Sequence, residues 1–271
     1  MKVVILAGGL GTRLAEETLV KPKPMVEIGG IPMIEHIMNW YMKYNFNEFI
    51  ICLGYKGHEI ISYFKDYNLK NSNITISSNG RIETINSSSK PWKINLIQTG
   101  ENTQTGGRIK KIANHLKDDE QFFMTYGDGL SNVDLNKLLE FHNNQKKLAT
   151  ITAVRPLARF GALEITKNKV SSFKEKPISE SGWINGGFFV LSKKAIKYID
   201  NFLEPFETGA LPRLAAKKEL SAFKHEGFWQ PMDTLREKLL LNDLWETGKA
   251  PWQVNKRKIE KIIPFKKAVV S

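Results

Sequence analysis

A glycine-rich turn directly after a short apolar run is the feature that most constrains the fold. The run ends at Leu6 and Ala7, and glycine follows at Gly8, Gly9 and Gly11. Glycines after a strand let backbone N–H groups approach phosphate closely. Leu14 stands where a dinucleotide motif needs its third glycine, and no Lys-Ser or Lys-Thr pair follows as a P-loop requires. The turn therefore predicts an anion site of another kind, or a tight turn without a ligand.

Short apolar runs alternate with segments of helical period. Runs without polar alternation are typical of parallel strands covered on both faces. The predicted strands are Lys2–Ala7, Glu48–Leu53, Gln121–Tyr126 and Leu148–Val154, and the predicted helices between them are Pro32–Tyr44 and Asp134–Lys146. This order indicates an α/β fold with a doubly wound, mostly parallel sheet.

One insertion interrupts that alternation. Asn68 to Gln98 is rich in Asn, Ser and Thr, and we interpret it as a projecting β-hairpin with Asn79-Gly80 at its turn. The later third predicts short strands in a second, α+β portion, followed by a closing helix: Ala162–Ile165, Val170–Phe173, Ile184–Leu191 and Thr234–Trp245. We expect one domain over residues 1–253 and a basic tail over 254–271.

Composition and charge exclude several classes of protein. The chain has 271 residues, 41% hydrophobic, and no apolar run approaches the roughly 18 residues that a membrane helix needs. It begins without a signal-peptide pattern, so we expect a cytoplasmic protein. Cys52, the single cysteine, is expected in the core. The net charge of +12 could indicate nucleic acid, but no aromatic-interleaved basic stretch or helix-turn-helix pattern supports that.

Isolated charged residues in glycine-containing loops suggest an anion-handling site. Arg13, Lys23 and Lys176 supply positive charge, and Asp128 follows a predicted buried strand. Two separate aspartates, Asp128 and Asp233, without a neighbouring His or Cys favour Mg²⁺. Alternatives stay open from the residues alone. Asp128 could be a turn aspartate, Asp233 could cap the following helix, and Lys176 could be surface.

Eight short motifs along the chain together resemble the pattern of a known family. The chain carries "GGLGTRL", "KPKPMVEIGG", "GYKG", "TGGR", "TYGDG", "INGGFFVL", "EGFWQPMDTLR" and "APW". Up to about Trp252 it resembles the sugar-phosphate nucleotidyltransferases, and within them the glucose-1-phosphate cytidylyltransferase branch. The resemblance implies transfer of a cytidylyl group from CTP to an α-sugar 1-phosphate, most simply glucose 1-phosphate, with Mg²⁺ as cofactor. It also implies a homo-oligomer.

The resemblance also assigns roles to residues. It implies that Arg13 and Lys23 are catalytic, that Mg²⁺ binds to Asp128 and Asp233, and that two groups of residues bind the substrates. The nucleotide side comprises Leu6, Ala7, Gly8, Gly9, Gly11, Thr12, Arg13, Thr105 and Arg108; the sugar-phosphate side comprises Gly161, Glu175, Lys176 and Asn185. For the base, a backbone carbonyl of residues 6–8 would accept from cytosine N4 while Arg108 donates to O2.

Two segments depart from the family pattern. The chain reads Pro156-Leu157-Ala158-Arg159-Phe160-Gly161 where members tend to have "PPGRFGAL", and Leu203–Ala215 replaces a "WEQEPL"-like stretch. Both are expected to border the sugar. Rival hypotheses are a uridylyl- or thymidylyltransferase, a cytidylyltransferase for another phosphorylated acceptor, and a non-catalytic nucleotide-sugar or nucleic-acid binding module.

Overall fold

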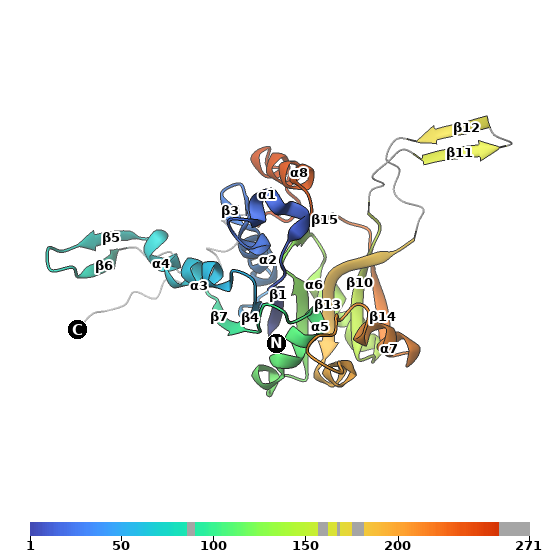
Figure 1. Cartoon of the computed structure of the whole chain (residues 1–271), viewed down its shortest axis with the longest axis horizontal. Helices are drawn as coiled ribbons and strands as arrows, with labels where there is room; N and C mark the ends of the chain where they lie inside the picture. Colours follow the sequence, from blue (N-terminus) through green and yellow to red (C-terminus); the bar gives the residue numbers. More distant parts are fainter. Residues whose placement is uncertain (86–89, 157–161, 167–168, 175–181, 255–271) are drawn as a thin grey trace.

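The computed structural model describes residues 1–85, 90–156, 162–166, 169–174 and 182–254. A seven-stranded sheet forms its centre, in the order β14-β10-β13-β8-β1-β4-β7 (Figure 1). Its strands are β1 (Val3–Ala7), β4 (Glu48–Leu53), β7 (Lys93–Gln98), β8 (Gln121–Tyr126), β10 (Ala149–Val154), β13 (Ile184–Ser192) and β14 (Leu220–His225). Strand β13 is antiparallel to both neighbours, and the other pairings are parallel, so the predicted mostly parallel sheet is confirmed.

Both faces of the sheet are covered, which explains why its strands are apolar throughout. Along β1, Val3 and Ile5 belong to one core cluster, while Val4 and Leu6 belong to the other. Helices α2 (Met33–Met42), α6 (Leu135–Gln145) and α8 (Leu235–Glu246) contribute to the first cluster. Helices α5 (Thr105–Lys111) and α7 (Ala210–Ala216) contribute to the second. Burial on both faces is what excludes polar alternation from β1.

The structure confirms the predicted helices and places the smaller elements. Asp134 caps α6 through its side chain, as its place at the start of the predicted segment suggests. The remaining helical elements are η1 (Thr12–Leu14), α1 (Ala15–Thr18), η2 (Lys23–Met25), α3 (Gly57–Lys65), α4 (Tyr67–Lys70), η3 (Ala113–Leu116) and η4 (Lys193–Tyr198). The remaining strands are β2 (Glu27–Ile28), β3 (Ile31–Pro32), β5 (Asn73–Ile76), β6 (Ile82–Ile85), β9 (Gly129–Ser131), β11 (Ala162–Thr166), β12 (Lys169–Lys174) and β15 (Trp229–Pro231).

The predicted hairpin exists, but the insertion is shorter than expected. Strands β5 and β6 pair and extend away from the central sheet (Figure 1). Gly80, at φ 81°, donates its N–H to the Ser77 carbonyl and closes the turn. Strand β7 was expected within the insertion, but it pairs with β4 at the edge of the central sheet. The inserted part therefore ends before Lys93.

Three further predictions concern Cys52, membrane-spanning helices and the C-terminal tail. Cys52 is buried in β4, and burial raises the pKa of its thiol to about 12, as expected for a core cysteine. In the ranges that the structure describes, no helix is long and apolar enough to cross a membrane. Of the predicted basic tail over 254–271, residues 255–271 lie outside the described residues.

Candidate functional site

The two predicted metal-binding aspartates come together through a short β-ribbon. Asp128 follows β8, and the chain then forms β9, which pairs antiparallel with β15. Asp233 follows β15, and the N–H of Met232 donates to the carbonyl of Asp128 at 2.8 Å. This ribbon carries Asp233 to the carboxyl end of the central strands, where ligands of open α/β sheets bind.

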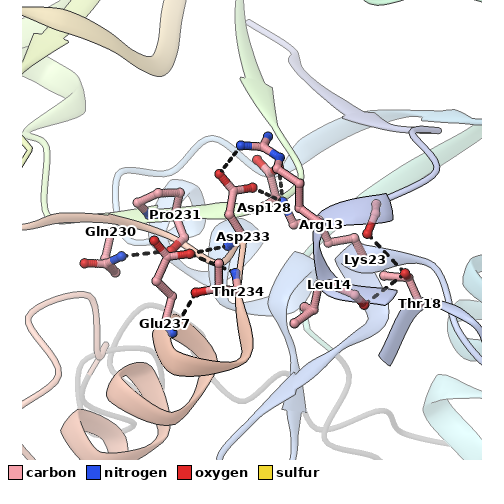
Figure 2. A network of polar contacts seen from close by, with 11 residues as sticks. Arg13, Leu14, Thr18, Lys23, Asp128, Gln230, Pro231, Asp233, Thr234 and Glu237 are labelled. Carbon is pink, nitrogen blue, oxygen red and sulfur yellow. Dashed lines mark hydrogen bonds and ion pairs between the residues drawn. The ribbon is translucent and has the colours of Figure 1, made fainter. Parts of the chain in front are cut away.

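A single buried lysine joins the two carboxylates. The Lys23 ammonium donates to Asp128 Oδ2 at 2.7 Å and to Asp233 Oδ1 at 2.6 Å (Figure 2). Only 7% of Lys23 and 8% of Asp233 is exposed, so water screens this interaction weakly. Burial acts to lower the pKa of Lys23, but the attraction and hydrogen bonds of both aspartates outweigh it, and the pKa is raised. Lys23 therefore stays charged.

Arg13 extends the cluster towards solvent. Its Nη1 lies 2.7 Å from Asp233 Oδ2, and 71% of its side chain is exposed. The Asp233 carboxylate thus contacts a buried cation through one oxygen and an exposed cation through the other. An exposed guanidinium can turn towards an incoming phosphate, which it can bind in a bidentate manner.

The structure decides between the two interpretations of Asp233. The N-cap of α8 is Thr234, whose hydroxyl accepts from the Glu237 N–H. Glu237 in turn accepts from the N–H groups of Asp233 and Thr234, which completes a capping box. Because the cap is supplied by Thr234, the carboxylate of Asp233 is available to the cations.

The donor set fits a magnesium ion. Both carboxylates lie within hydrogen-bonding distance of one nitrogen, so they are close enough to share a small cation. Among the described residues, no group of three or more His, Cys, Asp or Glu side chains could hold a metal. Mg²⁺ often binds through one or two carboxylates and completes its octahedron with water and substrate phosphates. The site therefore suits a metal that arrives with a nucleotide.

The glycine turn lies beside this cluster and is held by its neighbours. Gly11 has φ 67°, in the left-handed region that favours glycine, and its carbonyl accepts from the Thr18 hydroxyl. A Cβ on Gly8 would lie 2.2 Å from the Arg108 guanidinium, which leaves no room for a side chain. Leu6 and Ala7 are buried at the end of β1, while Gly9 and Thr12 are exposed. The exposed part of the turn can therefore meet a ligand.

The position of Arg108 does not match the proposed base recognition. Its guanidinium is buried and donates to backbone carbonyls, among them Leu53 at 3.0 Å and Gly8 at 2.8 Å. The Gly8 carbonyl also accepts from the Tyr55 N–H, so both of its lone pairs have donors. In this arrangement the Gly8 carbonyl and both terminal nitrogens of Arg108 already have protein partners. Arg108 instead fixes the path of the glycine turn.

Thr105 and Asn185 meet through two residues that sequence reasoning did not select. The Thr105 hydroxyl donates to Glu207, and Glu207 also accepts from Tyr126, to which Asn185 donates. The sequence held weak signals for both: Tyr126 lies in the "TYGDG" motif, and Glu207 lies in the stretch that departs from the family pattern.

Three predicted sugar-side residues lie outside the described residues: Gly161, Glu175 and Lys176.

Comparison with known proteins places the chain in a family. Residues 2–236 match the family described as nucleotidyl transferase. The chain belongs to this family. The glucose-1-phosphate cytidylyltransferase of Salmonella typhimurium is 52% identical over 254 residues, with 93% of this chain and 99% of that protein covered. The probable glucose-1-phosphate cytidylyltransferase of Bacillus subtilis is 42% identical, with 94% and 100% covered.

A solved structure supports the fold of this nucleotidyltransferase. The crystal structure of HddC from Yersinia pseudotuberculosis, complexed with GMP-PN, superposes with a TM-score of 0.65. It is 29% identical and covers 90% of this chain and 99% of its own. The α/β prediction and the predicted family are therefore both confirmed.

Proposed function

We propose that this enzyme transfers the cytidylyl group of CTP to α-glucose 1-phosphate and releases pyrophosphate. The observation that carries the proposal is the Lys23 ammonium held between Asp128 and Asp233, with Arg13 beside it, at the end of the central strands. The choice of CTP and glucose 1-phosphate is supported by the 52% identity to the Salmonella typhimurium protein.

The chemistry needs charge neutralisation more than proton transfer. A sugar phosphate is already a nucleophile, so its oxygen can attack the α-phosphorus in line without a general base. The obstacle is that two anions must approach each other. Fixed cations and donors that are oriented before the reaction lower that barrier because they need no reorganisation during it.

The residues of this chain can divide that task. Arg13 is exposed and can turn from Asp233 to the triphosphate, while Gly9 and Thr12 are exposed at the same turn. Lys23 is buried, so its ammonium can act on the phosphates only at the inner end of the site, where we place the α-phosphate. Mg²⁺ bound by Asp128 and Asp233 would supply charge to the phosphate oxygens and to the leaving pyrophosphate.

We keep the predicted residues on the two substrate sides, but the role of Arg108 changes from contact with the base to support of the glycine turn. We propose that Leu6, Ala7 and Gly8 form the inner wall of the nucleotide site and that Arg108 acts by holding Gly8. Asn185 is placed on the sugar side because one N–H of its amide remains after it donates to Tyr126.

The test is a matrix of nucleotides against sugar 1-phosphates, with pyrophosphate release as the readout and Mg²⁺ present. We expect the highest kcat/KM for CTP with α-glucose 1-phosphate, and CDP-glucose as the second product. A higher value for UTP or dTTP would refute the cytidylyl assignment while keeping a nucleotidyltransferase. Turnover of CTP with another sugar 1-phosphate but not with glucose 1-phosphate would refute only the assignment of glucose 1-phosphate as the acceptor.

A further inference from the structure

Glu207 occupies the centre of a hydrogen-bond chain beside the site. It lies in the segment between η4 and α7, and its carboxylate is half-buried. Oε2 accepts from the Thr105 hydroxyl at 2.6 Å, and Oε1 accepts from the Tyr126 hydroxyl at 2.5 Å. Each oxygen of the carboxylate thus has a hydroxyl donor from a different element.

The Tyr126 branch leads to the sugar side. Tyr126 ends β8, two residues before Asp128. Its hydroxyl oxygen accepts from Asn185 Nδ2 at 3.2 Å, and Asn185 Oδ1 accepts from the Gly187 N–H at 2.8 Å. The Asn185 amide is therefore held at both ends, once by Tyr126 and once by the backbone of β13.

A carboxylate at the head of this chain fixes the direction of every hydrogen bond in it. An ionised carboxylate only accepts, so the Tyr126 proton must point to Glu207. The lone pairs of Tyr126 then face Asn185, which must present an N–H there and its oxygen to the Gly187 N–H. One N–H of Asn185 is left for a ligand.

The Thr105 branch leads to the nucleotide side. Thr105 begins α5, and its oxygen also accepts from the Phe206 N–H at 2.8 Å. The same helix carries Arg108, which holds the carbonyl of Gly8. One carboxylate therefore connects the helix that supports the glycine turn with the asparagine predicted to meet the sugar.

We propose that Glu207 is a positioning residue for the sugar 1-phosphate: through Tyr126 it orients the amide of Asn185 towards the sugar hydroxyls. This inference rests on the proposed function and adds to it a residue that does not itself touch the substrate. Loss of a charge-assisted hydrogen bond in such a chain changes a binding constant by roughly tenfold or more.

The experiment measures KM for α-glucose 1-phosphate, KM for CTP, kcat and the melting temperature on the full chain. Glu207→Gln retains the shape but accepts well from only one hydroxyl, and Tyr126→Phe removes the link to Asn185. Glu204→Gln is the matched control, because Glu204 lies in the same segment and bonds to Arg213 and the Asp200 N–H. Its partners lead away from Asn185.

We expect Glu207→Gln and Tyr126→Phe each to raise KM for the sugar phosphate by roughly tenfold, with a smaller effect on KM for CTP. The double variant should be no worse than the more impaired single variant, because both changes cut one chain. Glu204→Gln should lower the melting temperature and leave KM for the sugar phosphate unchanged.

An unchanged KM for the sugar phosphate in Glu207→Gln would overturn the proposal, as would an equal rise in Glu204→Gln or additive effects in the double variant. These outcomes leave the proposed function intact, since the wild-type chain would still turn over. An inactive wild-type chain would instead refute the proposed function, and this inference with it.

Discussion

Two buried lysine–carboxylate clusters lie on different parts of this molecule and have different surroundings. In the first, Lys23 joins Asp128 and Asp233 at the ends of strands. In the second, Lys90 bonds to Glu35 on helix α2. Each cluster pairs a lysine with a carboxylate that is largely shielded from solvent, Asp233 in the first and Glu35 in the second, so the presence of such a pair does not distinguish a reaction site from a structural contact.

The neighbours of each carboxylate distinguish the candidate reaction site from the structural cluster. Glu35 is 5% exposed and accepts from the hydroxyls of Tyr63 and Tyr67 as well as from Lys90, which also donates to Asn39 at 2.8 Å. The donors come from the protein on every side. Asp233 instead faces Arg13, most of which is in solvent, and Asp128 is one-third exposed. The first cluster is open to a ligand and the second is closed.

The largest effect is expected when the open cluster loses a charge. Asp233→Asn and Asp128→Asn keep the side-chain volume and leave Lys23 one carboxylate. We expect kcat to fall by at least about 100-fold, because the lost charge acts on the transition state. Binding of Mn²⁺, followed by its electron paramagnetic resonance signal, should weaken in both variants, while the melting temperature stays near that of the wild type. A large fall in melting temperature with normal turnover would show that this cluster is structural too.

The closed cluster should respond in the opposite way. Glu35→Gln leaves the Lys90 charge without its partner carboxylate, and breaking a buried pair in this way costs about 3 kcal/mol of unfolding free energy. Urea unfolding measures this loss. KM for both substrates should remain unchanged, because the hydrogen-bond partners of the Glu35 side chain among the described residues are Tyr63 on α3, Tyr67 on α4 and Lys90. If KM rose with unchanged stability, the contrast between the clusters would fail.

A smaller effect separates the cap of α8 from the carboxylate next to it. Thr234→Ala removes the hydroxyl that accepts from Glu237 and should lower the unfolding free energy by about 1 kcal/mol. Because Asp233 keeps both cations, kcat should change little. A loss of turnover comparable to that of Asp233→Asn would mean that the cap and the carboxylate act as one unit.

The smallest effect concerns acid stability on the structural side. Burial lowers the pKa of His36, whose Nε2–H donates to the Ile28 carbonyl, and burial also lowers the pKa of His142 and His225. A depressed folded-state pKa means that the unfolded chain takes up the proton first. Stability is therefore complete above the ordinary histidine pKa of about 6.5 and declines as the pH falls below it.

Melting temperatures measured across this range should fall on acidification, and His36→Gln should make the decline shallower. An unchanged slope in that variant would place the effect on other groups. We therefore expect helix α2, which carries His36, to contribute to the pH dependence of folding.

The sequence predicted the strands and the site residues that a local pattern of residues identifies. Apolar runs identified β1, β4, β8 and β10, and an isolated aspartate after β8 indicated Asp128. Asp233 was indicated as a second isolated aspartate, and the family that the motif order resembles implies the same role for it. Whether that aspartate caps α8 could not be decided, because Asp and Thr are both good caps and stand side by side at positions 233 and 234.

What the sequence could not predict depends on long-range contacts. Arg108 looked available for a base, yet its guanidinium donates to five acceptors from three parts of the chain, at Gly8, Leu53 and residues 99–101. Strand β7 looked like part of the hairpin, and only its pairing with β4 assigns it to the central sheet. Glu207 was passed over because its partners, Thr105 and Tyr126, are distant in sequence.

The most direct test of the account is the rate of pyrophosphate release from CTP and α-glucose 1-phosphate, measured on the full chain with Mg²⁺ and again with excess EDTA. We propose that Asp128 and Asp233 would hold a divalent cation that the reaction requires. This proposal predicts rapid release with Mg²⁺, near-complete loss with EDTA, and recovery when Mg²⁺ is restored. Equal rates with and without the chelator would contradict it.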